Sequence, residues 1–269
     1  MVVITTFNEE MYHATGKGML ESVSQMLPAA KQIVYDELET IKLDAQTVKV
    51  CELDTFKQVF KENKDVITEQ FGGYADKTVG NNATNRSWNI RWFGWFRKVV
   101  MNHHAICETG YDDYVIFADS DIRFIKPFDE SFLKDITRGK AVSYFKGSRP
   151  AIDSGFVVVN GKDPNSKLFY EKFMNMFLTK EYKKLQRWDD GYVMTKIVKK
   201  TPDEWTHDFA KGKQQLIYKN TTGYITGGQV IPTTVWKDYI EHDKGIHWKQ
   251  DIVPHAGMYD PGNNKPKKK

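Results

Sequence analysis

The stretch that decides the fold is Tyr114-Val115-Ile116-Phe117-Ala118-Asp119-Ser120-Asp121. Its five largely apolar residues are typical of a buried strand, and two carboxylates follow where that strand should leave the sheet. In an open α/β sheet, ligands bind beyond the carboxyl ends of the strands. Carboxylate oxygens suit hard divalent cations such as Mg²⁺ or Mn²⁺. The stretch therefore predicts a metal site at Asp119 and Asp121, where a cation would neutralise a departing diphosphate.

The composition is that of an ordinary globular protein. The chain has 269 residues, of which 40% are hydrophobic and 28% are charged, enough to build a core without cross-links. Cys51 and Cys107 have no metal-ligand spacing, which indicates a reducing compartment rather than disulfides. The sequence contains no run of the roughly 20 apolar residues that a membrane span needs. Because the first residues also lack the features of a signal peptide, we expect a cytoplasmic protein.

The order of the apolar patterns predicts one α/β domain. Strands are expected at residues 2–5, 32–35, 48–53, 114–118, 141–145 and 155–160, and helices at 18–27, 55–63, 88–107, 167–178 and 188–198. Strands that alternate with helices predict a mostly parallel, mixed central sheet that is flanked by helices. We expect this domain to span residues 1–264, followed by a basic flexible tail at residues 265–269.

The positive charge is modest, but it is unevenly distributed. The formal net charge is +4 and the pI is about 8.7, values that do not by themselves imply nucleic acid. The cations of the later half include Lys183, Lys184, Arg187, Lys196, Lys199, Lys200, Lys211, Lys213, Lys265, Lys267, Lys268 and Lys269. Such a distribution suits a polyanionic partner, although a solvated surface with a solubilising end is the simpler interpretation.

Six motifs, taken in order, resemble those of the GT-A nucleotide-sugar glycosyltransferases. They are residues 3–8, Trp95-Phe96-Arg97-Lys98, residues 113–128, Asp153-Ser154-Gly155-Phe156, Trp188-Asp189-Asp190-Gly191-Tyr192 and His255-Ala256-Gly257. In that superfamily an apolar strand ends in Asp-x-Asp, and a later strand carries Ser/Thr-Gly. A late His-x-x-Gly or His-x-Gly segment supplies a third metal ligand. The motifs cover nearly the whole chain, and the resemblance implies a single GT-A (Rossmann-like) domain that transfers sugars.

The resemblance also implies roles for individual residues. The implied donor-binding residues are Thr5, Thr6, Phe7, Asn8, Arg97, Lys98, Asp119, Ser120 and Gly155. The implied metal ligands are Asp119, Asp121 and His255, and an imidazole ligand suits Mn²⁺ better than Mg²⁺. The catalytic candidates are Asp153, Asp189 and Asp190, since a carboxylate near the sugar accepts donor hydroxyls or acts as a base. Capping of a helix N-terminus is the rival interpretation of Asp189 and Asp190.

The acceptor is the least constrained part of the prediction. Residues 5–8, Tyr12 and residues 15–22 also resemble phage glycosyltransferases that glucosylate hydroxymethylated DNA bases. This resemblance implies a UDP-sugar donor, an acceptor hydroxyl on a hydroxymethylated or glucosylated base in phage DNA, and a location in the host cytoplasm. A glycan or lipid-linked glycan is the alternative acceptor. The sequence leaves open the sugar, the oligomeric state, and whether the reaction retains or inverts the anomeric configuration.

Two other classes of protein are alternatives. One is a nucleic-acid-binding protein that keeps a GT-A shell without turnover. The other is a metal-dependent nucleotidyltransferase, which shares the α/β shell and the acidic metal site. Residues 8–10, Asn8-Glu9-Glu10, stand where the glycine-rich loop of a nucleotidyltransferase would be expected. A nucleoside triphosphate substrate would distinguish that class from a glycosyltransferase.

Overall fold

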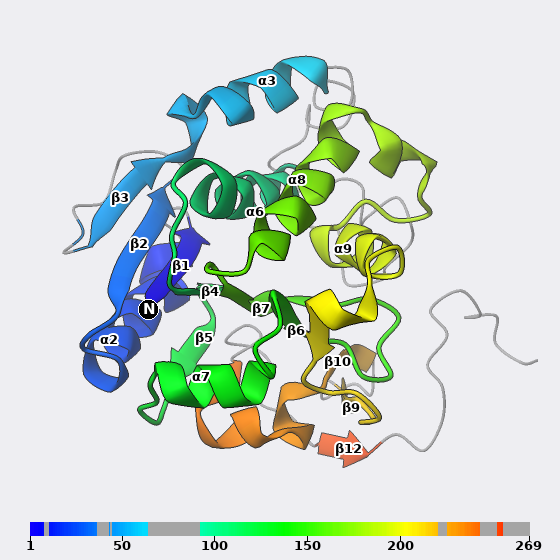
Figure 1. The fold of residues 1–269 in the computed structure, drawn as a ribbon. Helices are drawn as coiled ribbons and strands as arrows, with labels where there is room; N and C mark the ends of the chain where they lie inside the picture. The colour runs from blue at the N-terminus through cyan, green and yellow to red at the C-terminus, as the bar shows by residue number, and fades with distance from the viewer. Residues whose placement is uncertain are drawn as a thin grey trace, which may run out of the picture.

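A seven-stranded sheet forms the centre of the molecule (Figure 1). The computed structural model describes residues 1–7, 11–36, 43, 45–63, 92–219, 225–242 and 252–254. The strands of this sheet are β1 (Val2–Phe7), β2 (Lys31–Asp36), β3 (Gln46–Lys49), β4 (Tyr114–Ala118), β6 (Val142–Phe145), β7 (Asp153–Asn160) and β8 (Thr206–Asp208). Their spatial order is β3-β2-β1-β4-β7-β6-β8.

The pairing within this sheet is mostly parallel. Strands β3, β2, β1 and β4 run parallel to one another, and β8 runs parallel to β6. Strand β7 is antiparallel to both of its neighbours, β4 and β6. The predicted α/β class and mixed central sheet are confirmed. Because β1 and β4 are adjacent and parallel, their carboxyl ends lie at the same edge of the sheet.

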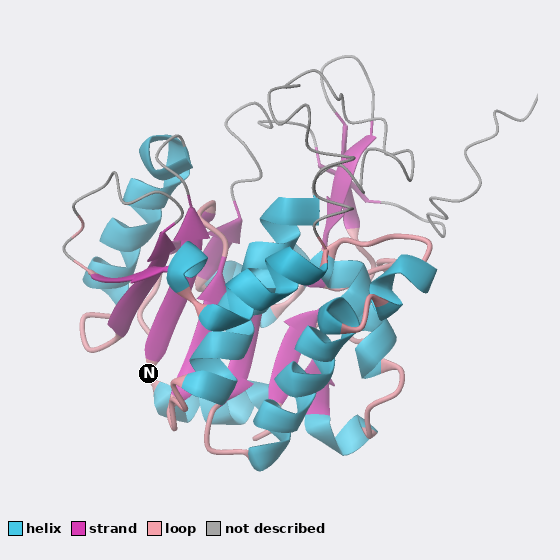
Figure 2. Ribbon diagram, turned by 90° about the horizontal axis from the view of Figure 1, so that it is seen from above, coloured by secondary structure: helices cyan, strands magenta, loops and turns pink. Residues whose placement is uncertain are grey.

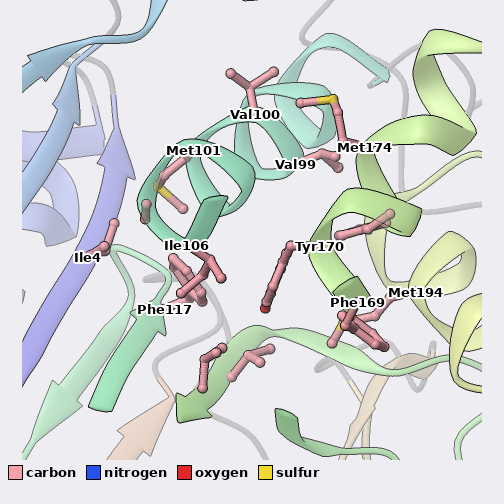
Figure 3. Close-up of a cluster of buried hydrophobic side chains, with 14 of the residues drawn as sticks. Ile4, Val99, Val100, Met101, Ile106, Phe117, Phe169, Tyr170, Met174 and Met194 are labelled. Atoms are coloured by element: carbon pink, nitrogen blue, oxygen red, sulfur yellow. The ribbon is translucent and has the colours of Figure 1, made fainter. Parts of the chain in front are cut away.

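Helices cover both faces of the sheet (Figure 2). On one face lie α3 (Asp54–Glu62), α6 (Trp92–His103), α8 (Pro164–Leu178) and α9 (Asp190–Val198); on the other lie α2 (Lys17–Met26) and α7 (Glu130–Thr137). The alternation of strand side chains produces two cores, since Val2 and Ile4 of β1 pack on the first face and Val3 on the second. Figure 3 shows the first core, in which side chains from α6 and α8 gather over β1 and β4.

Two smaller sheets complete the described part of the chain. β5 (Ile122–Phe124) pairs antiparallel with β11 (Ile240–His242), and β9 (Leu216–Lys219) pairs with β10 (Ile225–Gln229) and β12 (Ile252–Pro254). The β5–β11 pair matters for the site because β5 follows the Asp-x-Asp motif directly. Among the described residues, the structure contains no helix with the length and apolarity needed to cross a membrane.

Some element boundaries differ from the prediction for local reasons. The strand expected at residues 48–53 ends at Lys49, where a 3₁₀ turn (Val50–Glu52) takes over. The helix expected from residue 167 begins three residues earlier, at Pro164, because the Asp163 carboxylate caps it through the backbone N–H of Asn165. The helix expected from residue 188 begins at Asp190, since Asp189 is its N-cap.

Candidate active site

Lys98 lies between the two acidic motifs that the sequence singles out. Its Nζ is 2.5 Å from Oδ1 of Asp119, just beyond β4, and 3.9 Å from Oδ2 of Asp190, at the start of α9. The three side chains come from elements far apart in the sequence, and α6 carries Lys98 to the edge where β4 ends. The site therefore contains one ammonium group that joins the Asp-x-Asp motif to the Trp-Asp-Asp motif.

The electrostatics of this group favour a charged lysine. Burial lowers the pKa of Lys98, but the carboxylates of Asp119, Asp190 and Asp121 outweigh that effect, and the net pKa lies above its usual range. Lys98 is therefore protonated at neutral pH. It carries a fixed positive charge at the edge of the sheet.

Asp190, unlike Lys98, has a pKa that lies close to neutral pH. Burial raises its pKa to about 6; the nearby Lys98 opposes this rise, while the carboxylates of Asp189 and Asp119 add to it. The Asp190 side chain is only 6% exposed, and its Oδ1 accepts a hydrogen bond from the backbone N–H of Gly191. A buried carboxylate whose pKa lies close to neutral pH is suited to proton transfer or to binding hydroxyls.

Asp189, by contrast, is held on both oxygens. Its Oδ1 accepts the backbone N–H of Tyr192 at 3.0 Å, which caps α9, and its Oδ2 accepts Nε of Arg187 at 2.9 Å. Both oxygens are therefore engaged in structure at the helix N-terminus. Of the two adjacent aspartates, Asp190 is the one that faces Lys98.

The third catalytic candidate, Asp153, lies at the start of β7 in an ion pair with Arg149. Two residues on, Gly155 lets the backbone of β7 approach the acidic motif closely. A Cβ at Gly155 would lie 3.0 Å from Oδ2 of Asp119, 3.2 Å from Oδ1 of Asp153 and 3.2 Å from Cε1 of His242. These four residues therefore converge on one point, which explains why a glycine follows Ser154.

His242 is a functional candidate that the sequence reasoning missed. Its Nε2 is 3.3 Å from Oδ1 of Asp121, and its side chain is 3% exposed. The pairing of β11 with β5 places His242 opposite Ile122, directly after the Asp-x-Asp motif. The signal was present in the sequence, because His242-Asp243-Lys244-Gly245 has the His-x-x-Gly spacing. The expected ligand His255 lies outside the described residues, as does Asn8.

The donor set suits a divalent cation. Asp119 and His242 approach the Cβ position of Gly155, and His242 also contacts Asp121; such a mixture of oxygen and nitrogen ligands is typical of Mn²⁺. In the part of the chain that the structure describes, these groups do not form a ready three-ligand cluster. Instead, Asp119 contacts the ammonium of Lys98 and Asp121 contacts His242. The residue types are thus suitable metal ligands, although one of the carboxylates, Asp119, contacts the Lys98 ammonium.

Thr5, Thr6 and Phe7, which the sequence predicts as nucleotide-binding residues, are buried at the carboxyl end of β1. Thr6 donates its hydroxyl to the backbone carbonyl of Tyr35 at 2.7 Å, whereas the buried Thr5 hydroxyl has no hydrogen-bond partner among the described residues. Thr15 donates to the Ser120 hydroxyl at 3.2 Å, which brings the π-helical turn Tyr12–Gly16 beside the Asp-x-Asp motif. The ring of Phe7 packs against Tyr12, with centroids 5.6 Å apart.

Arg97 and one large groove complete the description. Arg97 is 7% exposed in α6, and burial lowers its pKa to about 10.

A groove of about 680 Å³, lined by Met1, Leu27, Phe128, Tyr239 and others, lies away from this site. Because Met1 precedes β1, this groove lies at the amino end of that strand, opposite the end that carries the candidate site. The groove is therefore separate from the acidic cluster.

Comparison with known proteins gives matches to solved structures only. Neither a family model nor a curated protein matches the chain. Mouse xyloside xylosyltransferase 1 matches at 13% identity and a TM-score of 0.44, covering 77% of this chain and 85% of that one. The glycosyltransferase GlyE of Streptococcus pneumoniae matches at 14% identity and a TM-score of 0.42, covering 77% of this chain and 44% of that one.

The galactosyltransferase LgtC is a third match. It has 12% identity and a TM-score of 0.38, with 72% of this chain and 69% of that one covered. Identities and TM-scores this low do not say what the present chain does. Its function is therefore argued from its own side chains.

The close packing of Gly191, the residue after Asp190, can be tested by substitution. A Cβ at Gly191 would lie 2.3 Å from the carbonyl oxygen of Ile152, so Gly191→Ala must push α9 away from β7. We expect a loss of about 1–3 kcal/mol in the free energy of unfolding, the usual cost of overpacking. Thermal or urea unfolding measures it. Gly18→Ala in α2 is the matched control, because its nearest neighbour is the Arg123 side chain at 3.4 Å. Equal stability of the two variants would contradict this packing.

Proposed function

We propose that the protein is a metal-dependent glycosyltransferase, which moves a sugar from a nucleotide diphosphate donor to an acceptor hydroxyl. The observation that carries this proposal is the position of Lys98 between Asp119 and the buried Asp190. Transfer from a nucleotide sugar needs positive charge at the diphosphate, and a carboxylate near the sugar can bind its hydroxyls or act as a base. The two acidic motifs and the lysine that joins them supply both within one site.

The donor is proposed to be UDP-linked and to lie at the carboxyl ends of β1 and β4. Thr5, Thr6 and Phe7 would contact the base and ribose, with Ser120 beside them. The chain's own cation, Lys98, would lie close to the donor phosphates and contribute positive charge there. This role is supported by the 2.5 Å contact, because that contact already holds one positive charge at Asp119.

The metal ligands are proposed to be Asp119, Asp121 and His242, with Mn²⁺ as the preferred cation over Mg²⁺. We propose His242 rather than His255 because it contacts Asp121 directly. When bound, the cation supplies charge that stabilises the departing diphosphate. The residues of the chain hold that cation in place, and Gly155 keeps the space around it free of a side chain.

Asp190 is proposed as the carboxylate at the reaction centre. In its ionised form it would accept a hydrogen bond from a sugar or acceptor hydroxyl, and it would take up a proton if it acts as the base. Asp153 would contact donor hydroxyls from β7, held in position by Arg149. Asp189 would position Asp190 by capping α9, without itself touching the sugar.

The ionisation of Asp190 predicts the pH dependence of the reaction. The pKa of Asp190 is raised to about 6, so its carboxylate is protonated below that pH and ionised above it. We therefore expect kcat/KM, which reports groups of the free enzyme, to rise with pH through about 6. The residual activity of Asp190→Asn should lack this limb. A wild-type profile that stays flat between pH 5 and pH 7, a window of roughly one unit on either side, would contradict the role of Asp190.

The acceptor is proposed to be a hydroxymethylated or glucosylated base in DNA, and the uneven positive charge of the chain supports this. The test follows sugar transfer by mass spectrometry after incubation with sugar nucleotides and duplex DNA. We expect the mass of one sugar on hydroxymethylated DNA and none on unmodified DNA. Donor turnover without DNA modification would indicate that the acceptor is a glycan or lipid-linked glycan instead. Turnover of nucleoside triphosphates instead would make the protein a nucleotidyltransferase.

A further inference from the structure

One edge of the central sheet is rich in positive charge, although one of its cations, Arg149, is paired with Asp153. Residues 138–152 contain four cations and no carboxylate, and residues 206–219 contain three cations and one carboxylate. The cations are Arg138, Lys140, Lys146, Arg149, Lys211, Lys213 and Lys219. The single carboxylate, Asp208, accepts three backbone N–H groups, from Lys146, Gly147 and Ala210, at 2.9–3.0 Å. The Asp208 carboxylate is therefore largely occupied by hydrogen bonds to the backbone.

These two segments lie side by side at the last strand of the sheet. β8 is the edge strand next to β6, and the backbone N–H of Ser148 donates to the carbonyl of Lys213 at 3.0 Å. Burial lowers the pKa of His207 on β8, and Arg138, Lys140 and Lys211 lower it further against the opposing effect of Asp208. Three of the cations are thus close enough to His207 to affect its charge. We call Arg138, Lys140, Lys146, Arg149, Lys211 and Lys213 the basic edge.

Tight glycine turns hold the basic edge in a fixed form. Gly139, Gly147 and Gly212 have φ angles of 64°, 53° and 76°, and each follows a cation directly in the sequence. A Cβ at Gly139 or Gly212 would meet nothing within 4 Å, so these two turns face open space. A Cβ at Gly147 would lie 2.7 Å from the carbonyl of Lys213, so that turn is closely packed. The backbone of the two outer turns is therefore not covered by other residues at these glycines.

The basic edge reaches the candidate active site through Arg149. Arg149 pairs with Asp153, and the Oδ1 of Asp153 lies 3.2 Å from the Cβ position of Gly155. The same position is 3.0 Å from Oδ2 of Asp119. The backbone N–H of Gly155 donates to Oδ1 of Asp153 at 3.3 Å, and that of Asp119 donates to the carbonyl of Gly155 at 2.8 Å, so direct contacts run from Arg149 to the Asp-x-Asp motif. A ligand that follows the cations would bring one of its groups to this motif.

We propose that the basic edge binds the phosphate backbone of a nucleic acid and leads it to the candidate active site. This deepens the proposed function and rests on it for the reaction that follows binding. A row of cations on separate turns suits a polymer with repeated charges better than a single phosphate, because each turn can contact a different phosphate. The alternative, a solvated surface without a partner, predicts no specific loss when these lysines are removed.

The test compares two variants that lose the same charge. One is Lys140→Gln/Lys211→Gln/Lys213→Gln on the basic edge; the control, Lys57→Gln/Lys61→Gln/Lys162→Gln, removes three exposed lysines elsewhere. Binding of hydroxymethylated duplex DNA is followed by fluorescence anisotropy over a range of salt concentrations. If all three lysines contact phosphates, the slope of log affinity against log salt should fall by about 2.7, or roughly 0.9 for each contact. The control should keep the wild-type slope.

Measuring donor hydrolysis without DNA distinguishes a failure of the basic edge from a failure of the proposed glycosyltransferase activity. We expect both triple variants to hydrolyse the donor at the wild-type rate, since none of the six lysines belongs to the acidic cluster. Equal salt slopes in the three proteins, or no DNA binding by the wild type, would overturn the basic edge even if donor hydrolysis is normal. Absent donor hydrolysis in the wild type would instead overturn the glycosyltransferase proposal, whatever the salt slopes.

Discussion

Asp190→Asn is expected to lower the turnover of sugar transfer by about 10³-fold, the typical effect of losing a general acid–base group or its equivalent. The amide has the shape of the carboxylate but cannot ionise, so the reaction centre loses its negative charge. The fold should survive, because Lys98 keeps its contact with Asp119 and the amide oxygen still accepts from Gly191. Turnover is measured as release of nucleoside diphosphate, and folding by thermal unfolding.

Asp189→Asn is the matched control for this substitution. Asparagine caps helices as well as aspartate does, so α9 should still begin at the same residue. The variant loses the ion pair with Arg187, but no group that faces Lys98. We expect a loss of turnover below about 10-fold, since the change affects only the position of Asp190. A large loss in Asp189→Asn together with a small one in Asp190→Asn would reverse the two roles.

Asp121→Asn is the second substitution with a large expected effect. A bound cation contributes several kcal/mol of charge stabilisation, so removing one of its carboxylate ligands should lower turnover by on the order of 10³-fold. His242→Gln should raise the Mn²⁺ concentration needed for half-maximal turnover, because the imidazole beside Asp121 is lost. Both effects are measured by titrating Mn²⁺ into the turnover assay and, independently, by calorimetry of Mn²⁺ binding.

Two further histidine variants test whether His242 or His255 is the third metal ligand. His103→Gln is a control, since His103 contacts Glu108 at 3.1 Å, away from the acidic cluster, and its metal requirement should match the wild type. His255→Gln tests the ligand that the sequence motif first implied. If His255→Gln raises the Mn²⁺ requirement and His242→Gln does not, the third ligand is His255. Asp121→Asn with full activity would show that the metal site itself is misplaced.

The fold could be predicted largely from local sequence patterns. The strand that precedes Asp119, β4, is a continuous apolar run, and such a run can be recognised from local sequence alone. Helix capping is one of two interpretations of Asp189, and the structure favours it because Oδ1 of Asp189 accepts the backbone N–H of Tyr192. Helix starts were less accurate, because Asp163 and Asp189 each set the first helical residue through a single side-chain contact.

The arrangement of the candidate site depends on contacts between distant parts of the chain. Lys98 meets Asp190, 92 residues later, only because α6 and α9 cover the same face of the sheet. His242 meets Asp121 because β11 pairs with β5, and no local pattern predicts that pairing. The His-x-x-Gly spacing could have pointed to His242, but the later His255 has a similar setting. The basic edge likewise joins two segments about 60 residues apart through one short strand.

Metal-dependent cleavage of a nucleotide sugar at the site of Lys98 and Asp190 can be measured in one assay. The purified protein is incubated with a panel of UDP-sugars and Mn²⁺, with and without a chelator, and the release of UDP is measured. We predict release from at least one donor, abolished by the chelator and reduced on the order of 10³-fold in Asp190→Asn. No release from any donor, or release that neither the chelator nor Asp190→Asn affects, would contradict the proposed activity.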